Sequence, residues 1–271
     1  MKVFEFVPEG TQDCKVTAWL HGNEAFSEMD AYTYQRPAMI VCPGGGYTFK
    51  SAREAEPVAK QYFAAGYNTF ILWYSVGEEA KDFKPLCQLA STIAHVRKYA
   101  EEWWTLQDKI AVIGFSAGGH LACSLGTLFN EERFLKVFGR DEDIRPNAMV
   151  LSYPVITADE FAHTGSICHV SGAEIGTEDY KWFGLNNHVD EMTPPTFLWH
   201  TAEDSCVPVE NSLEMAAALS AAKVPFELHV FPEGPHGMSV CNKEVNSLCP
   251  YNARWVDMSI QWLKKVFEFE V

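Results

Sequence analysis

Residues 109–120 read KIAVIGFSAGGH, and this stretch decides the fold. The apolar run over 109–115 predicts a buried strand, and residues 116–128 predict a helix that follows without a spacer. Between them, Gly-Phe-Ser-Ala-Gly fits the pattern G-x-S-x-G, whose glycines relieve the crowding of Cβ atoms on a sharp turn. A serine on such a strand–turn–helix is exposed for nucleophilic attack, so Ser116 is the candidate nucleophile. The alternative is a plain tight turn with a capping serine.

Apolar strands and helical patterns alternate on both sides of this stretch. Further strands are predicted at 14–20, 38–42, 68–74, 148–154, 196–200 and 226–231, and further helices at 54–65, 85–103, 209–222 and 252–267. The strands are continuously apolar, which is typical of a mostly parallel sheet with helices on both faces, in an α/β protein. No linker, low-complexity run or repeat marks a boundary, so we expect one domain over 1–271. Residues 156–194 break the rhythm and are predicted to form a lid-like insertion at the carboxyl edge of the sheet.

A serine hydroxyl needs a base within hydrogen-bond reach to act as a nucleophile. In proteins with this elbow, the base comes last in the sequence, on a loop after the final strand. Among nine histidines, only His236 meets that demand, because residues 231–237 form a glycine- and proline-containing loop after the last predicted strand. His120, His200 and His229 lie in or at the ends of predicted elements, where structural roles are expected.

The acid that orients the base should follow the penultimate strand. Residues 200–208 read HTAEDSCVP, and Asp204 is the candidate we favour because the Val-Pro pair closes the turn as the next helix begins. Its carboxylate would fix the imidazole tautomer and stabilise the imidazolium. Glu203 and Asp190 are the alternatives.

Acyl transfer also needs backbone amides that stabilise a tetrahedral oxyanion. Ala117 supplies the amide directly after the nucleophile. A Pro-Gly-Gly-Gly-Tyr loop at 43–47 follows an apolar strand, and its glycines allow amides to turn toward a ligand. Gly45 and Gly46 are therefore the candidate partners of Ala117 in an oxyanion hole.

Four motifs in this order carry a resemblance to a known family. They are PGGGY at 43–47, GFSAGGH at 114–120, PPTFLWHTAED at 194–204 and PHG at 235–237. The chain resembles the α/β-hydrolase superfamily, in its hormone-sensitive-lipase-like and small bacterial carbohydrate-esterase branch. The resemblance implies an eight-stranded sheet and a two-step acyl-enzyme mechanism, with no metal or organic cofactor.

Two departures from that branch point to the substrate. The branch usually has His-Gly-Gly-Gly, where this chain has Pro43, and the Pro-Gly-Gly-Gly-Tyr form is similar to bacterial acetyl esterases that act on acetylated xylan fragments or other sugars. Residues 1–37 read as short strands, so the large helical cap of hormone-sensitive-lipase-like enzymes is not expected. Both features favour an open site and a bulky polar alcohol group. The candidate aromatic platforms, each also suited to the core, are Tyr47, Trp73, Tyr74, Trp182 and Phe183.

Charge and composition restrict the partners. The formal net charge is −15, with 36 acidic and 21 basic residues, which disfavours nucleic acid and anionic membranes and suits a neutral small molecule. Residues 1–6 do not resemble a signal peptide, so a cytoplasmic location is expected. The eight cysteines show no CxxC pair, and eight free thiols with no metal site are expected, with Cys241 and Cys249 pairing only in an oxidising compartment. A homo-oligomer paired through an edge strand is left open.

The first hypothesis is therefore a serine esterase that removes acetyl groups from small acetylated sugars or xylo-oligosaccharides. The second is a general short-chain carboxylesterase without sugar preference. A non-catalytic binding module of the same fold is the third, although every triad candidate is present. A peptidase of this fold usually carries a large extra domain, for which 271 residues leave no room.

Overall fold

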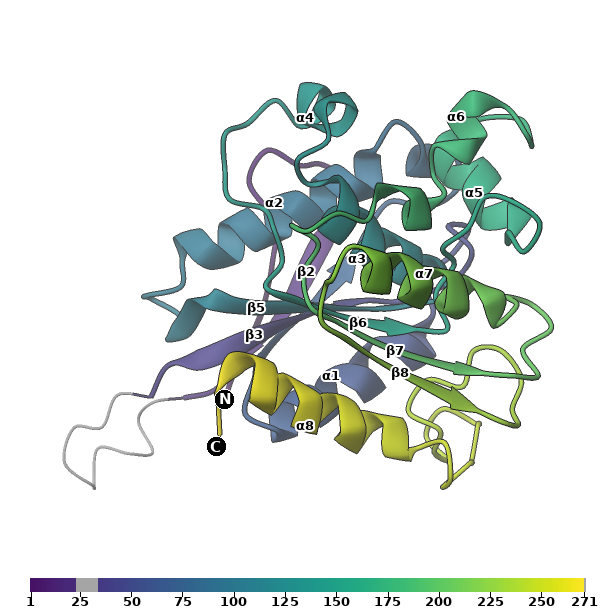
Figure 1. Ribbon diagram of the computed structural model, residues 1–271. Helices are drawn as coiled ribbons and strands as arrows, with labels where there is room; N and C mark the ends of the chain where they lie inside the picture. The colour runs from purple at the N-terminus through teal and green to yellow at the C-terminus, as the bar shows by residue number, and fades with distance from the viewer. Residues whose placement is uncertain (23–33, 271) are drawn as a thin grey trace.

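The computed structural model describes residues 1–22 and 34–270, which contain one eight-stranded sheet (Figure 1). The strand order is β1-β2-β4-β3-β5-β6-β7-β8; β1 and β2 run antiparallel to their neighbours, and the other pairings are parallel. The strands are β1 (Lys2–Phe6), β2 (Lys15–Leu20), β3 (Arg36–Cys42), β4 (Asn68–Trp73), β5 (Thr105–Phe115), β6 (Ala148–Ser152), β7 (Thr196–Thr201) and β8 (Phe226–Phe231). The expected mostly parallel sheet of eight strands is confirmed.

Helices cover both faces of this sheet, as expected. Figure 1 shows α1 and α8 on one face, and α2, α3 and α7 on the other. The α-helices are α1 (Glu56–Ala64), α2 (Lys84–Lys98), α3 (Ala117–Leu128), α4 (Glu132–Phe138), α5 (Thr164–Ser171), α6 (Glu178–Lys181), α7 (Glu210–Ala221) and α8 (Arg254–Phe267). The described residues also include the short 3-10 helices η2 (Ala52–Glu54), η3 (Gly77–Ala80) and η4 (Leu185–His188).

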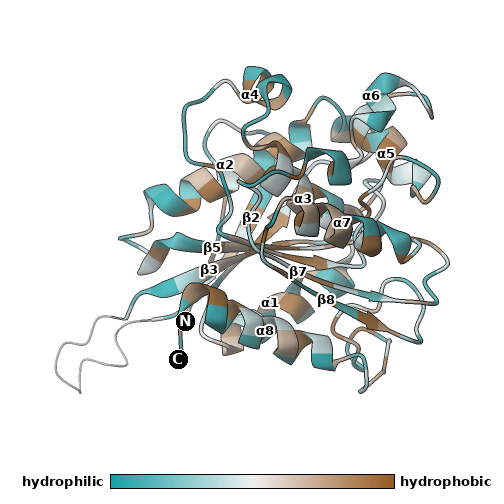
Figure 2. Cartoon of the chain, in the orientation of Figure 1, coloured by the Kyte–Doolittle hydropathy of each residue, from teal (hydrophilic) through white to brown (hydrophobic). Residues whose placement is uncertain are grey.

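The buried side chains form two clusters, one on each face of the sheet. In β3, Ala38, Ile40 and Cys42 belong to one cluster, whereas Met39 and Val41 belong to the other. Successive side chains of a strand point to opposite faces, so a strand covered on both faces must be apolar throughout. Figure 2 shows the resulting hydrophobic strands at the centre of the molecule.

The structure differs from the sequence predictions mainly at element ends and in the insertion. The helix predicted over 85–103 ends at Lys98, and a turn follows in which the Thr105 amide donates to the Ala100 carbonyl (2.8 Å). β5 therefore begins at Thr105, before the strand predicted over 109–115. Within 156–194 lie the short elements α5, α6 and η4, which are too short to show a helical period. Part of the region read as short strands, 23–33, lies outside the described residues. In the described part, no helix is long and apolar enough to cross a membrane.

Candidate active site

Ser116 occupies the sharp turn between β5 and α3. Its backbone has φ 54° and ψ −120°, a conformation that is strained for any residue except glycine. The Ser116 amide donates a hydrogen bond to the Ser152 carbonyl (3.0 Å), which joins the turn to β6. A Cβ on Gly114 would lie 2.0 Å from the Gly118 carbonyl oxygen, and one on Gly118 would lie 2.2 Å from that of Cys42. The turn therefore requires both glycines of the motif.

Ser116, His236 and Asp204 form one hydrogen-bonded series, although they lie far apart in the sequence. The Nε2 atom of His236 is 2.8 Å from Ser116 Oγ, and its Nδ1 atom is 2.6 Å from Asp204 Oδ2. An ionised carboxylate can only accept, so Nδ1 carries the proton and Nε2 is left to accept from the serine hydroxyl. All three residues follow parallel strands, at the carboxyl ends of β5, β7 and β8. This is the arrangement of a nucleophile, a base and an orienting acid.

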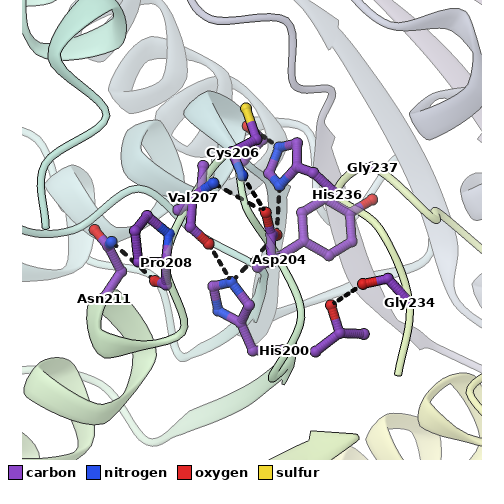
Figure 3. Close-up of polar contacts among 12 residues, drawn as sticks. His200, Asp204, Cys206, Val207, Pro208, Asn211, Gly234, His236 and Gly237 are labelled. Atoms are coloured by element: carbon purple, nitrogen blue, oxygen red, sulfur yellow. Dashed lines mark hydrogen bonds and ion pairs between the residues drawn. The ribbon is translucent and has the colours of Figure 1, made fainter. Parts of the chain in front are cut away.

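Asp204 is held by donors on both of its oxygens, as Figure 3 shows. The backbone amides of Cys206 and Val207 each donate to Oδ1 at 2.9 Å, and Nε2 of His200 lies 3.4 Å from Oδ2. Burial raises the pKa of Asp204, but the hydrogen bonds from His200 and His236 outweigh burial, and the pKa falls well below its usual range. Asp204 therefore stays ionised throughout the neutral and mildly acidic range.

The alternative acids lie elsewhere. Glu203 is exposed, and its carboxylate accepts a long hydrogen bond from the Gly234 amide (3.4 Å). Asp190 accepts from the Met192 amide (2.9 Å) in a turn before β7. The structure brings Asp204, and neither alternative, to His236.

The other histidines considered above have structural partners. His200 is buried between the Ser212 hydroxyl and the Val207 carbonyl, and His229 lies 2.6 Å from Glu227 on β8. His120 is buried in α3, and burial lowers its pKa to about 4, so its ring is neutral.

The loop that carries His236 is fastened at several points. The Arg53 guanidinium donates to the carbonyls of Gly237 (2.6 Å) and Val245 (2.8 Å). On the other side of the loop, the Asn252 side chain donates to the Glu233 carbonyl at 2.8 Å. Because β8 ends at Phe231, the sheet does not hold His236 directly. These hydrogen bonds to the loop backbone position its imidazole instead.

The glycine turn after β3 presents free amides beside Ser116. Gly45 has φ +127° and Gly46 φ +63°, and a Cβ on Gly45 would lie 2.2 Å from the Phe49 carbonyl oxygen. Within the described residues, the amides of Gly45 and Gly46 donate no hydrogen bond. The amide of Ala117 opens α3, where no carbonyl of the helix can accept from it. The turn and the helix end together could receive an oxyanion.

Of the five candidate aromatic platforms, three are buried and two are half-buried. Tyr47, Tyr74 and Phe183 are buried; the Tyr47 hydroxyl lies 2.9 Å from Nδ1 of His120. Trp73 and Trp182 are half-buried and are used elsewhere: Trp73 donates to the Thr17 hydroxyl (3.0 Å), and the Trp182 ring packs on Arg133 and Phe83. None of the five lines the cavity at Ser116. An aromatic residue with a polar tip satisfies that tip in the core as readily as at a site.

The cavity that contains Ser116 and His236 has a volume of about 390 Å³. Its wall includes Phe49, whose side chain is exposed (60%), although sequence reasoning had passed over it. Its position in the loop after the glycine turn was the available signal. His163, which lies between residues 156 and 194, also lines the cavity. No group of three or more His, Cys, Asp or Glu side chains in the described chain could hold a metal ion.

The sheet, the strained serine turn and the order of the three side chains define an α/β hydrolase. The sequence model of the BD-FAE family matches residues 28–219, and the chain belongs to this family of α/β-hydrolase esterases.

The chain is also similar to three known proteins. It is 36% identical over 230 residues to endo-1,4-beta-xylanase B of Butyrivibrio fibrisolvens, covering 84% of this chain and 35% of the relative. It is 30% identical over 207 residues to the acetylxylan esterase of Xylanibacter ruminicola, covering 74% of this chain and 40% of the relative. The chain thus spans well under half the length of both. The crystal structure of an acetyl ester-xyloside bifunctional hydrolase from Caldicellulosiruptor lactoaceticus matches with a TM-score of 0.81 and 35% identity, over 94% of this chain and 88% of that one.

Proposed function

We propose that this protein is a serine esterase that hydrolyses short acyl esters and removes acetyl groups from small acetylated sugars or xylo-oligosaccharides. The observation that carries the proposal is the hydrogen-bonded series of Ser116, His236 and Asp204 at a cavity that Gly45 and Gly46 also line. The names of the similar proteins, which include an acetylxylan esterase and an acetyl ester-xyloside hydrolase, support the acetyl and sugar parts of the substrate.

The proposed reaction has two acyl-transfer steps. Ser116 Oγ attacks the ester carbonyl carbon while Nε2 of His236 takes the hydroxyl proton, and the carbonyl electrons move to the oxygen. The amides of Gly45, Gly46 and Ala117 receive this oxyanion. When the intermediate collapses, the ester bond breaks and His236 gives its proton to the departing alcohol. A water molecule, deprotonated by the same imidazole, then releases the carboxylic acid and restores Ser116.

Substrate preference tests this function directly. We expect acetate release from acetylated xylo-oligosaccharides with a kcat/KM above that for p-nitrophenyl acetate, and lower values again for butyryl and octanoyl esters. The measurement compares initial rates of wild-type protein and Ser116→Ala on all four substrates. A preference for longer acyl chains with inert sugars would favour a general carboxylesterase. No Ser116-dependent turnover of any ester would favour a binding module.

Phe49 is proposed to hold the sugar, in place of the aromatic residues first considered. An exposed phenyl ring on the wall of the cavity can pack against the C–H face of a sugar ring in the alcohol part of the ester. Phe49→Ala is expected to lower kcat/KM for acetylated xylo-oligosaccharides about tenfold, by the loss of that apolar contact, while p-nitrophenyl acetate stays within about twofold. Leu135→Ala, which removes an exposed apolar side chain on α4, is the control. An equal loss on both substrates would show that Phe49 supports the turn and not the sugar.

Three further expectations belong to this proposal. The acidic balance of the chain continues to favour a neutral small-molecule substrate over nucleic acid or an anionic membrane. The eight cysteines are free, which is consistent with a cytoplasmic location. Association of copies into a homo-oligomer stays a prediction. The strands that could pair between copies are β1 and β8, the two edge strands of the sheet.

A further inference from the structure

Glu54 is a buried carboxylate that the reaction above does not use. It ends η2 (Ala52–Glu54), is 4% exposed and lies on the wall of the Ser116 cavity. The described residues provide no ion pair for it, and the guanidinium of its neighbour Arg53 donates to backbone carbonyls of the His236 loop instead. A buried carboxylate without a counter-ion is costly unless its oxygens are hydrogen-bonded, so its contacts carry information.

One oxygen of Glu54 holds the glycine turn. Its Oε2 atom accepts the Gly44 amide at 2.9 Å. A Cβ placed on Gly44 would lie 2.7 Å from that oxygen and 3.1 Å from Ser116 Cβ, so the turn passes directly between the carboxylate and the nucleophile. The next two residues of the turn are Gly45 and Gly46, which line the cavity and whose amides donate no hydrogen bond within the described residues. The hydrogen bond from Gly44 to Glu54 therefore fixes the start of the segment that carries the Gly45 and Gly46 amides.

The other oxygen holds the base. Oε1 of Glu54 accepts the Tyr153 hydroxyl at 2.7 Å, and the same hydroxyl accepts the Ser239 amide (2.8 Å) from the His236 loop. The Tyr153 ring packs edge to face on the His236 imidazole, with centroids 5.0 Å apart and planes at 70°. Tyr153 has φ +37°, a strained value that this network fixes.

We propose that Glu54 is a positioning residue that sets the oxyanion turn and the His236 ring in register, through Gly44 and Tyr153. The proposal rests on the function proposed above. The two parts of the site come from loops after β3 and β8. Glu54 bonds the first loop directly through the Gly44 amide, and it reaches the second through the Tyr153 hydroxyl, which accepts the Ser239 amide. Acyl transfer requires the amides and the base to face one carbonyl group together, and an error of about 1 Å in such geometry costs on the order of 10²-fold in rate.

The charge of Glu54 also acts on the base. Burial raises the pKa of Glu54 above its usual value, although hydrogen bonds from Tyr153 and Gly44 and the charge of His236 oppose this rise in part. By the same interaction, an ionised Glu54 stabilises the imidazolium that forms when His236 takes a proton. The other groups that face His236 are Asp204, the Tyr153 ring, the Ser116 hydroxyl and His163. Loss of the Glu54 charge should therefore move the acidic limb of the pH–rate profile to lower pH.

Glu54→Gln tests the proposal, because the side-chain amide keeps the shape of the carboxylate. Its NH₂ group, however, would face either the Gly44 amide or the Tyr153 hydroxyl, and both of these are donors. We expect kcat to fall about 10²-fold, the size of one lost oxyanion contact, with KM within about threefold and the acidic limb shifted down. The matched control is Glu56→Gln, which removes an exposed carboxylate two residues away. Tyr153→Phe removes only the contact toward the base and keeps the charge, so we expect a smaller loss without the shift.

A second measurement separates this proposal from the proposed function. The rate at which a fluorophosphonate labels Ser116 reports the nucleophile and its base without any ester substrate. Slower labelling of Glu54→Gln than of Glu56→Gln supports the positioning role even if no ester is turned over by the wild type. Equal labelling rates and superimposable pH profiles for the two variants would overturn it. If Glu54→Gln does not fold, Glu54→Asp and Tyr153→Phe give the same comparison.

Discussion

Ser116→Ala is expected to lower kcat for an acetyl ester by about 10⁶-fold, to the level that the free amides and substrate binding sustain alone. The variant loses the atom that forms the acyl-enzyme, while Gly45, Gly46 and Ala117 keep their places. His236→Ala is expected to cost about as much, because a serine hydroxyl without its base at 2.8 Å is a poor nucleophile. Initial rates and a pre-steady-state burst, with melting temperature as the check on folding, measure both losses.

The double variant decides whether the two side chains work as one unit. A combined loss close to that of either single variant is expected, since removing the base cannot harm a site that has no nucleophile. Losses that multiply would contradict a shared step. Ser205→Ala, an exposed serine beside Asp204, is the control for a serine removed without chemical consequence.

Asp204→Asn is expected to lower kcat by about 10⁴-fold with little change in stability. The asparagine oxygen can still accept the amides of Cys206 and Val207, so the turn survives. Its amide nitrogen would instead face Nδ1 of His236 and donate to it. The imidazole then takes the other tautomer, and Nε2 presents a hydrogen to Ser116 instead of a lone pair.

Glu203→Gln is the matched control for this change, because it neutralises the adjacent exposed carboxylate. Its activity is expected to equal that of the wild type. A loss in Glu203→Gln comparable to that in Asp204→Asn would return Glu203 to consideration as the acid. The pH profiles add a second check: because Asp204 is ionised well below neutrality, its own protonation should not contribute to the acidic loss of wild-type activity.

The parts of the fold that were predictable are those determined locally. The turn at Ser116 requires glycines at 114 and 118 because backbone oxygens lie where their Cβ atoms would be, and that requirement is written in five consecutive residues. His236 and Asp204 were found because each follows a predicted strand in a fixed chain order. The strand pattern was equally readable, since strands covered on both faces are apolar throughout.

The contacts of the residues that line the cavity could not be predicted from local sequence patterns. Glu54 meets Tyr153 across 99 positions of the sequence, and nothing near either residue indicates that contact. Tyr47 is a second example: it was one of the candidate aromatic platforms, but its ring is buried and its hydroxyl lies 2.9 Å from Nδ1 of His120. The exposure of Phe49, two residues later, depends on the turn geometry and not on residue type.

The fastening of the His236 loop has a consequence for how the molecule tolerates change. β8 is one of the two edge strands of the sheet and has a neighbour on one side only, so it is open to fraying or pairing with another chain. The loop after it is tied instead to Arg53, which belongs to the segment after β3 near the middle of the sheet. A substitution that loosens β8 should therefore disturb the position of His236 less than a substitution of Arg53 would.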